Sequence, residues 1–155
     1  MEEAEEFKAV FSVRASNSEK FKVVVSCGTG HRVVVDEPSE LGGGGSGPNP
    51  IELFLASLAS CFAITLRIHS TREGVPIDRV EVEGRAELDL RSVLGIEGFE
   101  PGLELVELKA RIFSSAKCSD VDRVVDKTLR TWVVGSTVAK SGVLRVVVEK
   151  IGCST

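Results

Sequence analysis

The sequence predicts an α+β fold in which an antiparallel sheet packs on a long central helix. Three observations lead to this prediction. Several stretches alternate apolar and polar residues, one long apolar run has a clear helix start, and the predicted order of elements is βββ-α-ββ-α-β. A chain of 155 residues is long enough for a core of its own. We therefore expect a single domain over residues 1–155.

The chain opens with three stretches that favour strands. Residues 7–15 alternate in polarity, and the SNSE that follows favours a turn. Residues 21–27 and 31–37 are rich in valine and are separated by GTG, a typical hairpin sequence. Pro38 is expected to end the third strand.

A helix start follows the glycine-rich segment. Asn49 is a good N-cap, Pro50 suits the first helical position, and Glu52 stands three residues after the cap. This spacing predicts a capping box, in which the Glu52 carboxylate bonds back to the cap N–H. The helix is expected to continue to about Arg72 and to end at EGVP.

The second half of the chain predicts two strands, a helix and a final strand. Residues 78–91 alternate between an apolar row and a charged row, which is typical of a strand with one solvated face. Residues 103–113 again alternate between apolar and polar side chains, so we expect residues 78–91 and 103–113 to form a long hairpin. Apolar residues recur at helical spacing over 119–135, and residues 143–151 form the last strand.

The apolar run of residues 51–68 is not expected to cross a membrane. It contains Glu52 and Arg67, and the uncharged part between them is shorter than the ~20 residues that a spanning helix needs. A buried core helix is the better interpretation.

Composition narrows the class of protein. The net charge is −4 and the basic residues are dispersed, which argues against a nucleic-acid surface. The first ten residues, MEEAEEFKAV, lack the features of a secretory leader, so we expect a cytoplasmic protein. The chain has no glutamine and two asparagines, a composition typical of thermophiles.

Four cysteines are present, at positions 27, 61, 118 and 153. They form no C-x-x-C pair and have no histidine at ligand spacing, so we expect neither a metal site nor a cofactor. Cys61 lies in the apolar run, where a buried core cysteine is also a typical finding. A Cys–His pair with His31 or His69 stays open, since such partners meet in space rather than in sequence.

The run GGGGSG before the helix has three interpretations. A P-loop needs a lysine directly after its glycines, and here Pro48 and Asn49 follow. A nucleotide-binding protein is therefore the least favoured of the three. The others are a flexible connection and the approach to a pocket that contains the Cys61 thiol.

The stretch DEPSELGGGGSGPNPIELFLASLASCFAITL, residues 36–66, resembles the signature of the OsmC family and its organic-hydroperoxide-resistance relatives. Four features keep their register: an acidic–proline step, a glycine cluster, an Asn-Pro helix start with Glu52, and a cysteine nine positions later. The order of predicted elements also agrees with the family along nearly the whole chain.

The resemblance implies a swapped, intertwined homodimer with its active site at the subunit interface. It implies reduction of organic hydroperoxides, with Cys61 as the attacking thiol and Glu52 as a supporting carboxylate. An arginine is expected beside the thiolate, and Arg32 is our candidate. An external dithiol is the implied reductant.

The family's second cysteine, which resolves the oxidised thiol, is missing from its expected place. Counting back from Ser136 puts the family's Cys-Pro step at Trp132 and Val133. Cys118, Cys27 or Cys153 could resolve instead if its Cα came within about 7 Å of that of Cys61. Cys118 is favoured by its predicted place at a helix N-terminus, which lowers a thiol's pKa.

Two further hypotheses about the function of the chain stay open. An external thiol could resolve a one-cysteine peroxidase. Alternatively, the chain is a non-catalytic protein of the same fold that binds a small apolar ligand at the dimer interface, a hypothesis favoured by Trp132 in the place of the resolving thiol.

Overall fold

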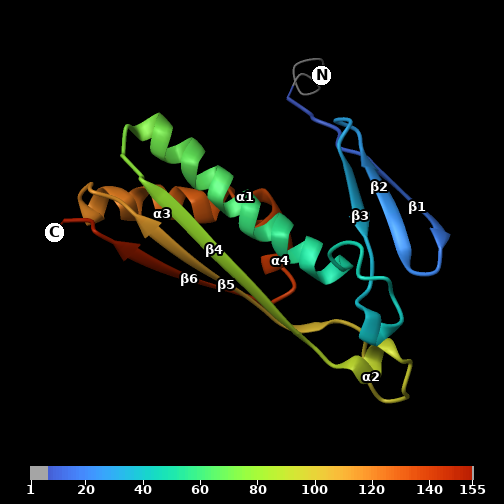
Figure 1. Cartoon of the computed structure of the whole chain (residues 1–155). Coiled ribbons are helices and arrows are strands. Elements are labelled where there is room, and N and C mark those ends of the chain that lie inside the picture. The colour runs from blue at the N-terminus through green and yellow to red at the C-terminus, as the bar shows by residue number, and fades with distance from the viewer. Residues whose placement is uncertain (1–6, 155) are drawn as a thin grey trace. The chain divides into compact units, whose positions relative to one another are not determined.

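The computed structural model describes residues 7–154, drawn in colour in Figure 1. The chain divides into two compact units, the first ending at Leu53 and the second beginning at Phe54. The acidic start of the chain, which entered the prediction of a cytoplasmic protein, lies mostly outside the described residues.

The first unit contains a three-stranded antiparallel sheet in the order β1-β2-β3. Its strands are β1 (Val13–Glu19), β2 (Lys22–Cys27) and β3 (Arg32–Val35). The prediction of three strands is confirmed, as is the hairpin at GTG, where the Cys27 N–H bonds the His31 carbonyl at 2.8 Å.

The predicted bounds of the first strand are wrong. We expected a strand over 7–15 and a turn at SNSE, but SNSE lies inside β1 and the chain turns at Lys20, which has φ 40°. The Asn17 side chain explains the difference, because its amide donates to the carbonyls of Glu19, Lys20 and Lys22 across the turn. The strand is exposed along its whole length, so it needs no apolar alternation.

The glycine-rich segment is anchored by one buried carboxylate rather than left as a free linker. Asp36 is 3% exposed. One of its oxygens accepts from the Ser46 hydroxyl at 2.7 Å, the Ser46 N–H at 3.1 Å and the Gly44 N–H at 3.2 Å. Its other oxygen accepts from the Glu37 N–H at 2.9 Å. The loop contains a short 3₁₀ helix, η2 (Ser39–Leu41), and closes around this carboxylate.

Two of the glycines are needed for close backbone approach. A Cβ on Gly43 would lie 1.8 Å from the Glu37 carbonyl oxygen, and one on Gly47 would lie 2.1 Å from that of Val34. No side chain fits at either position without moving the backbone. The glycines therefore allow the backbone of residues 43–47 to pack directly against the backbone of residues 34–37.

Replacing Asp36 with asparagine is expected to lower the free energy of unfolding in a pH-dependent way. The Ser46 hydrogen bonds hold the pKa of Asp36 below its ordinary value of 3.8. The stabilisation is therefore present above the carboxyl's unfolded-state pKa and is lost as the pH falls through the lower, folded-state pKa. Urea midpoints of wild type and Asp36→Asn are expected to differ at about pH 7 and to converge as the pH falls well below 3.8. Ser46→Ala, which removes one donor, should have a smaller effect. A gap that does not change with pH would contradict this account.

Helix α1 (Pro50–Glu73) confirms the predicted start and end. The Asn49 N–H donates to the Glu52 carboxylate and the Glu52 N–H donates to the Asn49 side chain, each at 2.8 Å. Gly74, with φ 65°, follows the last turn. The Glu73 carboxylate pairs with Lys127 at 2.6 Å and with Arg123 at 2.8 Å, both on a later helix, and these partners lower the pKa of Glu73.

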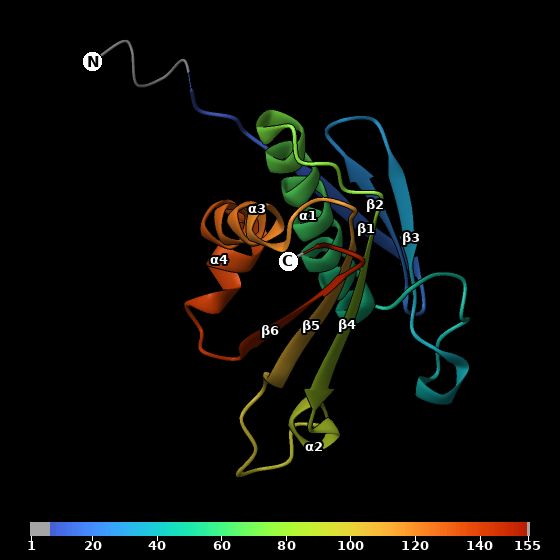
Figure 2. The ribbon, with the colours of Figure 1, turned by 90° about the vertical axis from the view of Figure 1, so that its left-hand side faces the viewer.

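The second unit has a three-stranded sheet in the order β4-β5-β6, with helices on one face (Figures 1 and 2). Strands β4 (Arg79–Leu88) and β5 (Leu103–Phe113) form the predicted antiparallel hairpin. Strand β6 (Leu144–Ile151) pairs parallel with β5, so the prediction of a wholly antiparallel sheet is wrong at this strand. The helical crossover between β5 and β6 returns the chain in the same direction, which parallel pairing requires.

Two helical segments differ from their predictions. The strand expected over 78–91 stops at Leu88, and a short helix α2 (Leu90–Val93) follows, capped by the Asp89 side chain on the Arg91 N–H. The single helix expected over 119–135 is two helices, α3 (Cys118–Thr131) and α4 (Val133–Ala139). The chain breaks at Trp132, whose ψ of 92° is extended rather than helical.

The core of the second unit lies between its sheet and its helices. Residues from α1, β5 and α3 are fully buried there: Leu58, Phe62, Leu66, Val106, Leu108, Ala110, Ile112, Val121 and Val124. The opposite face of the sheet carries ion pairs, among them Arg111 with Glu81 and Glu83, as expected for a solvated surface.

Helix α1 is long and apolar enough to cross a membrane by length and composition alone. Its buried row of Leu58, Phe62, Leu66 and Ser70 nevertheless packs in the core of the second unit. On the other side of α1, Ile64 and Ile68 are 61% and 44% exposed, so the predicted burial of this helix is confirmed for one of its sides.

Candidate functional site

Cys61 lies on α1 at the boundary between the buried and the exposed side of the helix. Its neighbour Phe62 is 1% exposed, while Ile64, three residues on, is 61% exposed. Cys61 itself is half-buried and packs against the core. Cys61 and Cys27 are the free cysteines among the described residues. The thiol therefore has an ordered setting together with partial access to solvent.

Glu52 lies nine residues before Cys61 on the same helix. Nine residues correspond to about 900° of rotation and about 13 Å of rise, which puts the two side chains on opposite sides of α1. The Glu52 carboxylate accepts the Asn49 N–H, so its structural role is that of a cap. Its role as a partner of Cys61 stays a prediction that requires a second chain or a relay.

Arg32 is the first residue of β3 and is exposed. It pairs with Ser26 in the sheet of the first unit, whereas Cys61 belongs to the second unit. No ion pair involves Arg32 among the described residues. Its predicted approach to the Cys61 thiolate stays a prediction.

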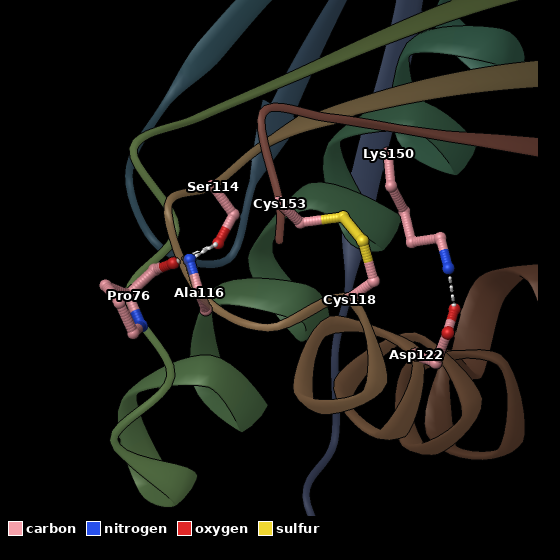
Figure 3. Close-up of a disulfide and its surroundings, with 7 residues drawn as sticks. All are labelled: Pro76, Ser114, Ala116, Cys118, Asp122, Lys150 and Cys153. Atoms are coloured by element: carbon pink, nitrogen blue, oxygen red, sulfur yellow. Dashed lines mark hydrogen bonds and ion pairs between the residues drawn. A yellow bond between two sulfur atoms is a disulfide. The ribbon is translucent and has the colours of Figure 1, made fainter. Parts of the chain in front are cut away.

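Cys118 is joined to Cys153 by a disulfide, shown in Figure 3. Cys118 is the first residue of α3, which confirms its predicted place at a helix N-terminus. Its sulfur is bonded to Cys153 and not to Cys61, so the structure does not have the predicted partnership of Cys118 with Cys61. Sequence spacing gave no sign of this pairing, because the two cysteines are 35 residues apart and lie on either side of two helices and a strand.

Trp132, the residue expected in the place of the resolving cysteine, lies against α1. It is 2% exposed, and its ring meets that of Phe62 edge to face with centroids 5.4 Å apart. A Cβ on Gly135 would lie 2.2 Å from the Trp132 ring, so glycine leaves the space that the indole occupies. The indole N–H has no acceptor among residues 7–154. The Trp132 ring therefore covers Phe62, the residue that follows Cys61 in the chain.

The histidines and other metal-ligating residues do not gather around Cys61. His69 Nε2 lies 2.6 Å from the Thr131 hydroxyl, which links α1 to the end of α3. His31 lies in the hairpin loop of the first unit. Within the described part of the chain, no group of three or more His, Cys, Asp or Glu side chains could hold a metal ion.

An apolar groove of about 560 Å³ lies on the exposed side of α1, beginning just after Cys61 in the sequence. Its lining residues come from α1 and β4: Ala63, Ile64, Arg67, Ile68, Thr71, Arg72 and Val80. Arg67 also donates to the backbone carbonyls of Ile77 and Asp78, which fixes one wall of the groove.

Comparison with known proteins identifies the fold. A sequence model of OsmC-like proteins matches residues 43–146. An OsmC-like protein from Mycoplasma pneumoniae has a TM-score of 0.77 at 15% identity, covering 93% of this chain and 97% of its own. An organic hydroperoxide resistance protein from Elizabethkingia anophelis has a TM-score of 0.66 at 20% identity, covering 97% and 99%.

A third neighbour, an organic hydroperoxide resistance protein OsmC from Legionella pneumophila, has a TM-score of 0.63 at 19% identity and covers 95% of this chain and 98% of its own. A search of curated proteins finds no significant match. The family model covers more than half of the chain and includes the helix that carries Cys61. The chain belongs to the OsmC family.

Proposed function

We propose that this protein reduces organic hydroperoxides with Cys61 as the attacking thiol, in defence against oxidative stress. The observation that carries the proposal is the place of Cys61: a free, half-buried cysteine on α1, inside the residues that the family model matches. Structural neighbours described as organic hydroperoxide resistance proteins support it.

The proposed first step is a two-electron reduction of the peroxide. The Cys61 thiolate attacks the outer peroxide oxygen, the O–O bond breaks, and the alcohol leaves after taking up a proton. Cys61 becomes a sulfenic acid. An external dithiol then returns it to the thiol and is itself oxidised. The apolar residues around Cys61 suit a hydroperoxide with an apolar body.

We further propose that a homodimer completes the site, in the cytoplasm. The first unit leaves Phe7, Val10 and Phe11 at 90% exposure or more, and β1 is exposed along its length. Large apolar side chains with this degree of solvent exposure are typical of a surface that another protein covers. We propose that a second copy supplies Glu52 or Arg32 to Cys61. Within one α1 helix, Glu52 and Cys61 point to opposite sides, so Glu52 cannot reach the Cys61 of its own chain.

Hydroperoxide consumption tests the proposal. With cumene hydroperoxide and dithiothreitol, wild type is expected to consume peroxide catalytically. Cys61→Ser should fall to the blank rate, a loss of at least about 10²-fold. Cys27→Ser is the matched control, since it removes the other free cysteine and should keep the activity. Equal rates for wild type and Cys61→Ser would reject the proposal.

A second candidate is a non-catalytic protein that binds a small apolar ligand. The 560 Å³ groove beside Ile64, Ile68 and Val80 favours it. Under this alternative, an apolar probe such as 1-anilinonaphthalene-8-sulfonate binds wild type and Cys61→Ser equally. Neither protein then consumes hydroperoxide, and Ile64→Glu loses the probe.

A further inference from the structure

A pocket of about 510 Å³ lies wholly within the first unit, and none of its lining residues has a place in the proposed reaction of Cys61. It is formed by the turn that joins β1 to β2 and by the glycine-rich loop before α1 (Figure 1). Its lining residues are Glu19, Lys20, Phe21, Lys22, Asp36, Gly44 and Ser46. The chemistry of this pocket is therefore set by contacts inside one unit.

Three consecutive residues at the turn between β1 and β2 line this pocket. In a regular strand, Phe21 would point away from Lys20 and Lys22, because side chains alternate between the two faces. Lys20 interrupts the alternation with φ 40°, the one positive φ of a non-glycine residue in the described part of the chain. The Asn17 amide holds this turn by donating to the carbonyls of Lys20 and Lys22 at 3.0 and 2.7 Å. The chain thus keeps a strained residue where two cations and an aromatic ring come together.

The glycine-rich loop supplies the other wall of the pocket. Asp36 lies there at 3% exposure, and its carboxylate already accepts hydrogen bonds from Gly44, Ser46 and the next residue in the chain. These bonds hold Gly44 and Ser46 in place and leave Asp36 little capacity to bind a ligand. The charges available to a ligand are those of the turn.

Lys20 and Lys22 are cations without a partner in this region. Neither forms an ion pair among the described residues. The Phe21 ring between them in the sequence is 52% exposed. The ring packs against Gly42, where an added Cβ would lie 3.2 Å from its Cε2 atom. Glu19, the other charged residue of the turn, is exposed. The turn therefore offers an aromatic surface with an ammonium group on each neighbouring residue.

We propose that this pocket binds small aromatic monoanions of the carboxylate class. The ring of the ligand packs on Phe21, and its carboxylate accepts charge-assisted hydrogen bonds from Lys20 and Lys22. Glu19 opposes binding, because its carboxylate repels an anion held at the same turn. This binding function is independent of the proposed reduction of hydroperoxides.

Isothermal titration calorimetry with 1-naphthoate tests the site. A ligand of this size is expected to bind wild type with a Kd of about 1 mM or below. Two matched probes separate the contributions of ring and charge. The first, 1-naphthalenemethanol, keeps the ring and lacks the charge, while hexanoate keeps the charge and lacks the ring. Each should bind at least about tenfold more weakly than 1-naphthoate.

Substitutions at the turn give effects of opposite sign. Lys20→Asn/Lys22→Gln, in which asparagine tolerates the positive φ, should weaken 1-naphthoate binding at least about tenfold. Phe21→Leu should also weaken it, whereas Glu19→Gln should tighten it about twofold. Lys8→Gln is the matched control, since it removes an exposed lysine of the same unit that does not line the pocket. Its affinity should equal that of wild type. Circular dichroism checks that each variant is folded.

Equal affinities of wild type for 1-naphthoate and 1-naphthalenemethanol would overturn the proposal without reference to any variant. A folded double lysine variant that binds 1-naphthoate as tightly as wild type would also overturn it. So would the absence of binding to wild type at concentrations well above about 1 mM.

Discussion

Replacing Trp132 with alanine is expected to lower the free energy of unfolding by about 3–5 kcal/mol. The indole is 2% exposed, joins α3 to α4 and packs edge to face on Phe62 of α1. Its removal leaves a cavity whose other wall, at Gly135, carries no side chain that could fill it. Urea unfolding followed by circular dichroism measures the loss.

The neighbouring Val133 supplies the matched control for this prediction. It is 72% exposed, so Val133→Ala should change the free energy of unfolding by no more than about 0.5 kcal/mol. A loss below about 1 kcal/mol in Trp132→Ala would show that the ring does not organise the helix pair as the structure indicates.

Removing the Cys118–Cys153 disulfide is expected to lower the free energy of unfolding by about 4 kcal/mol. The bond closes a loop over a sequence separation of 35, and restricting a loop of that length in the unfolded chain gives this value. Cys118→Ser/Cys153→Ser should therefore unfold at a clearly lower urea concentration than wild type when no reductant is present.

Reductant supplies the control for the disulfide prediction. Under conditions that open the bond, wild type should fall to the stability of the double variant, and the double variant should not change. A wild type that is no more stable than the double variant in the absence of reductant would contradict the prediction. Cys27→Ser, which removes a free thiol, should not respond to reductant differently from wild type.

Much of the fold follows from local signals in the sequence. The Asn49–Glu52 capping box and the EGVP stop fix both ends of α1, because each depends on residues within one turn of the helix. The β4–β5 hairpin follows from strict alternation, which buries one face of the sheet. These signals need no knowledge of distant contacts.

The features that sequence analysis missed depend on contacts between distant segments. The parallel pairing of β6 with β5 depends on how the two helices between them cross the sheet. The break at Trp132 depends on its packing against Phe62, which is 70 positions away in the chain. Helix α2 was missed because a four-residue helix gives little periodicity, although its Asp89 cap is a local signal.

In the candidate site, too, some residues could be placed from local signals and others depend on contacts between distant segments. The place of Cys61 on an apolar helix and of Glu52 at its start could be predicted from the motif alone. The pairing of Cys118 with Cys153 could not, because four cysteines without close spacing allow several pairings. No local signal brings Glu52 or Arg32 to Cys61, because Glu52 points to the opposite side of α1 and Arg32 belongs to the first unit.

The two free cysteines of the chain test the central claim, that Cys61 is a reactive thiol, within one molecule. Wild type is treated with less than one equivalent of cumene hydroperoxide, remaining thiols are alkylated, and peptides carrying Cys27 and Cys61 are quantified. We predict that Cys61 loses its alkylation in proportion to the hydroperoxide added while Cys27 keeps it. Equal loss at both cysteines, or loss at Cys27 first, would contradict the account.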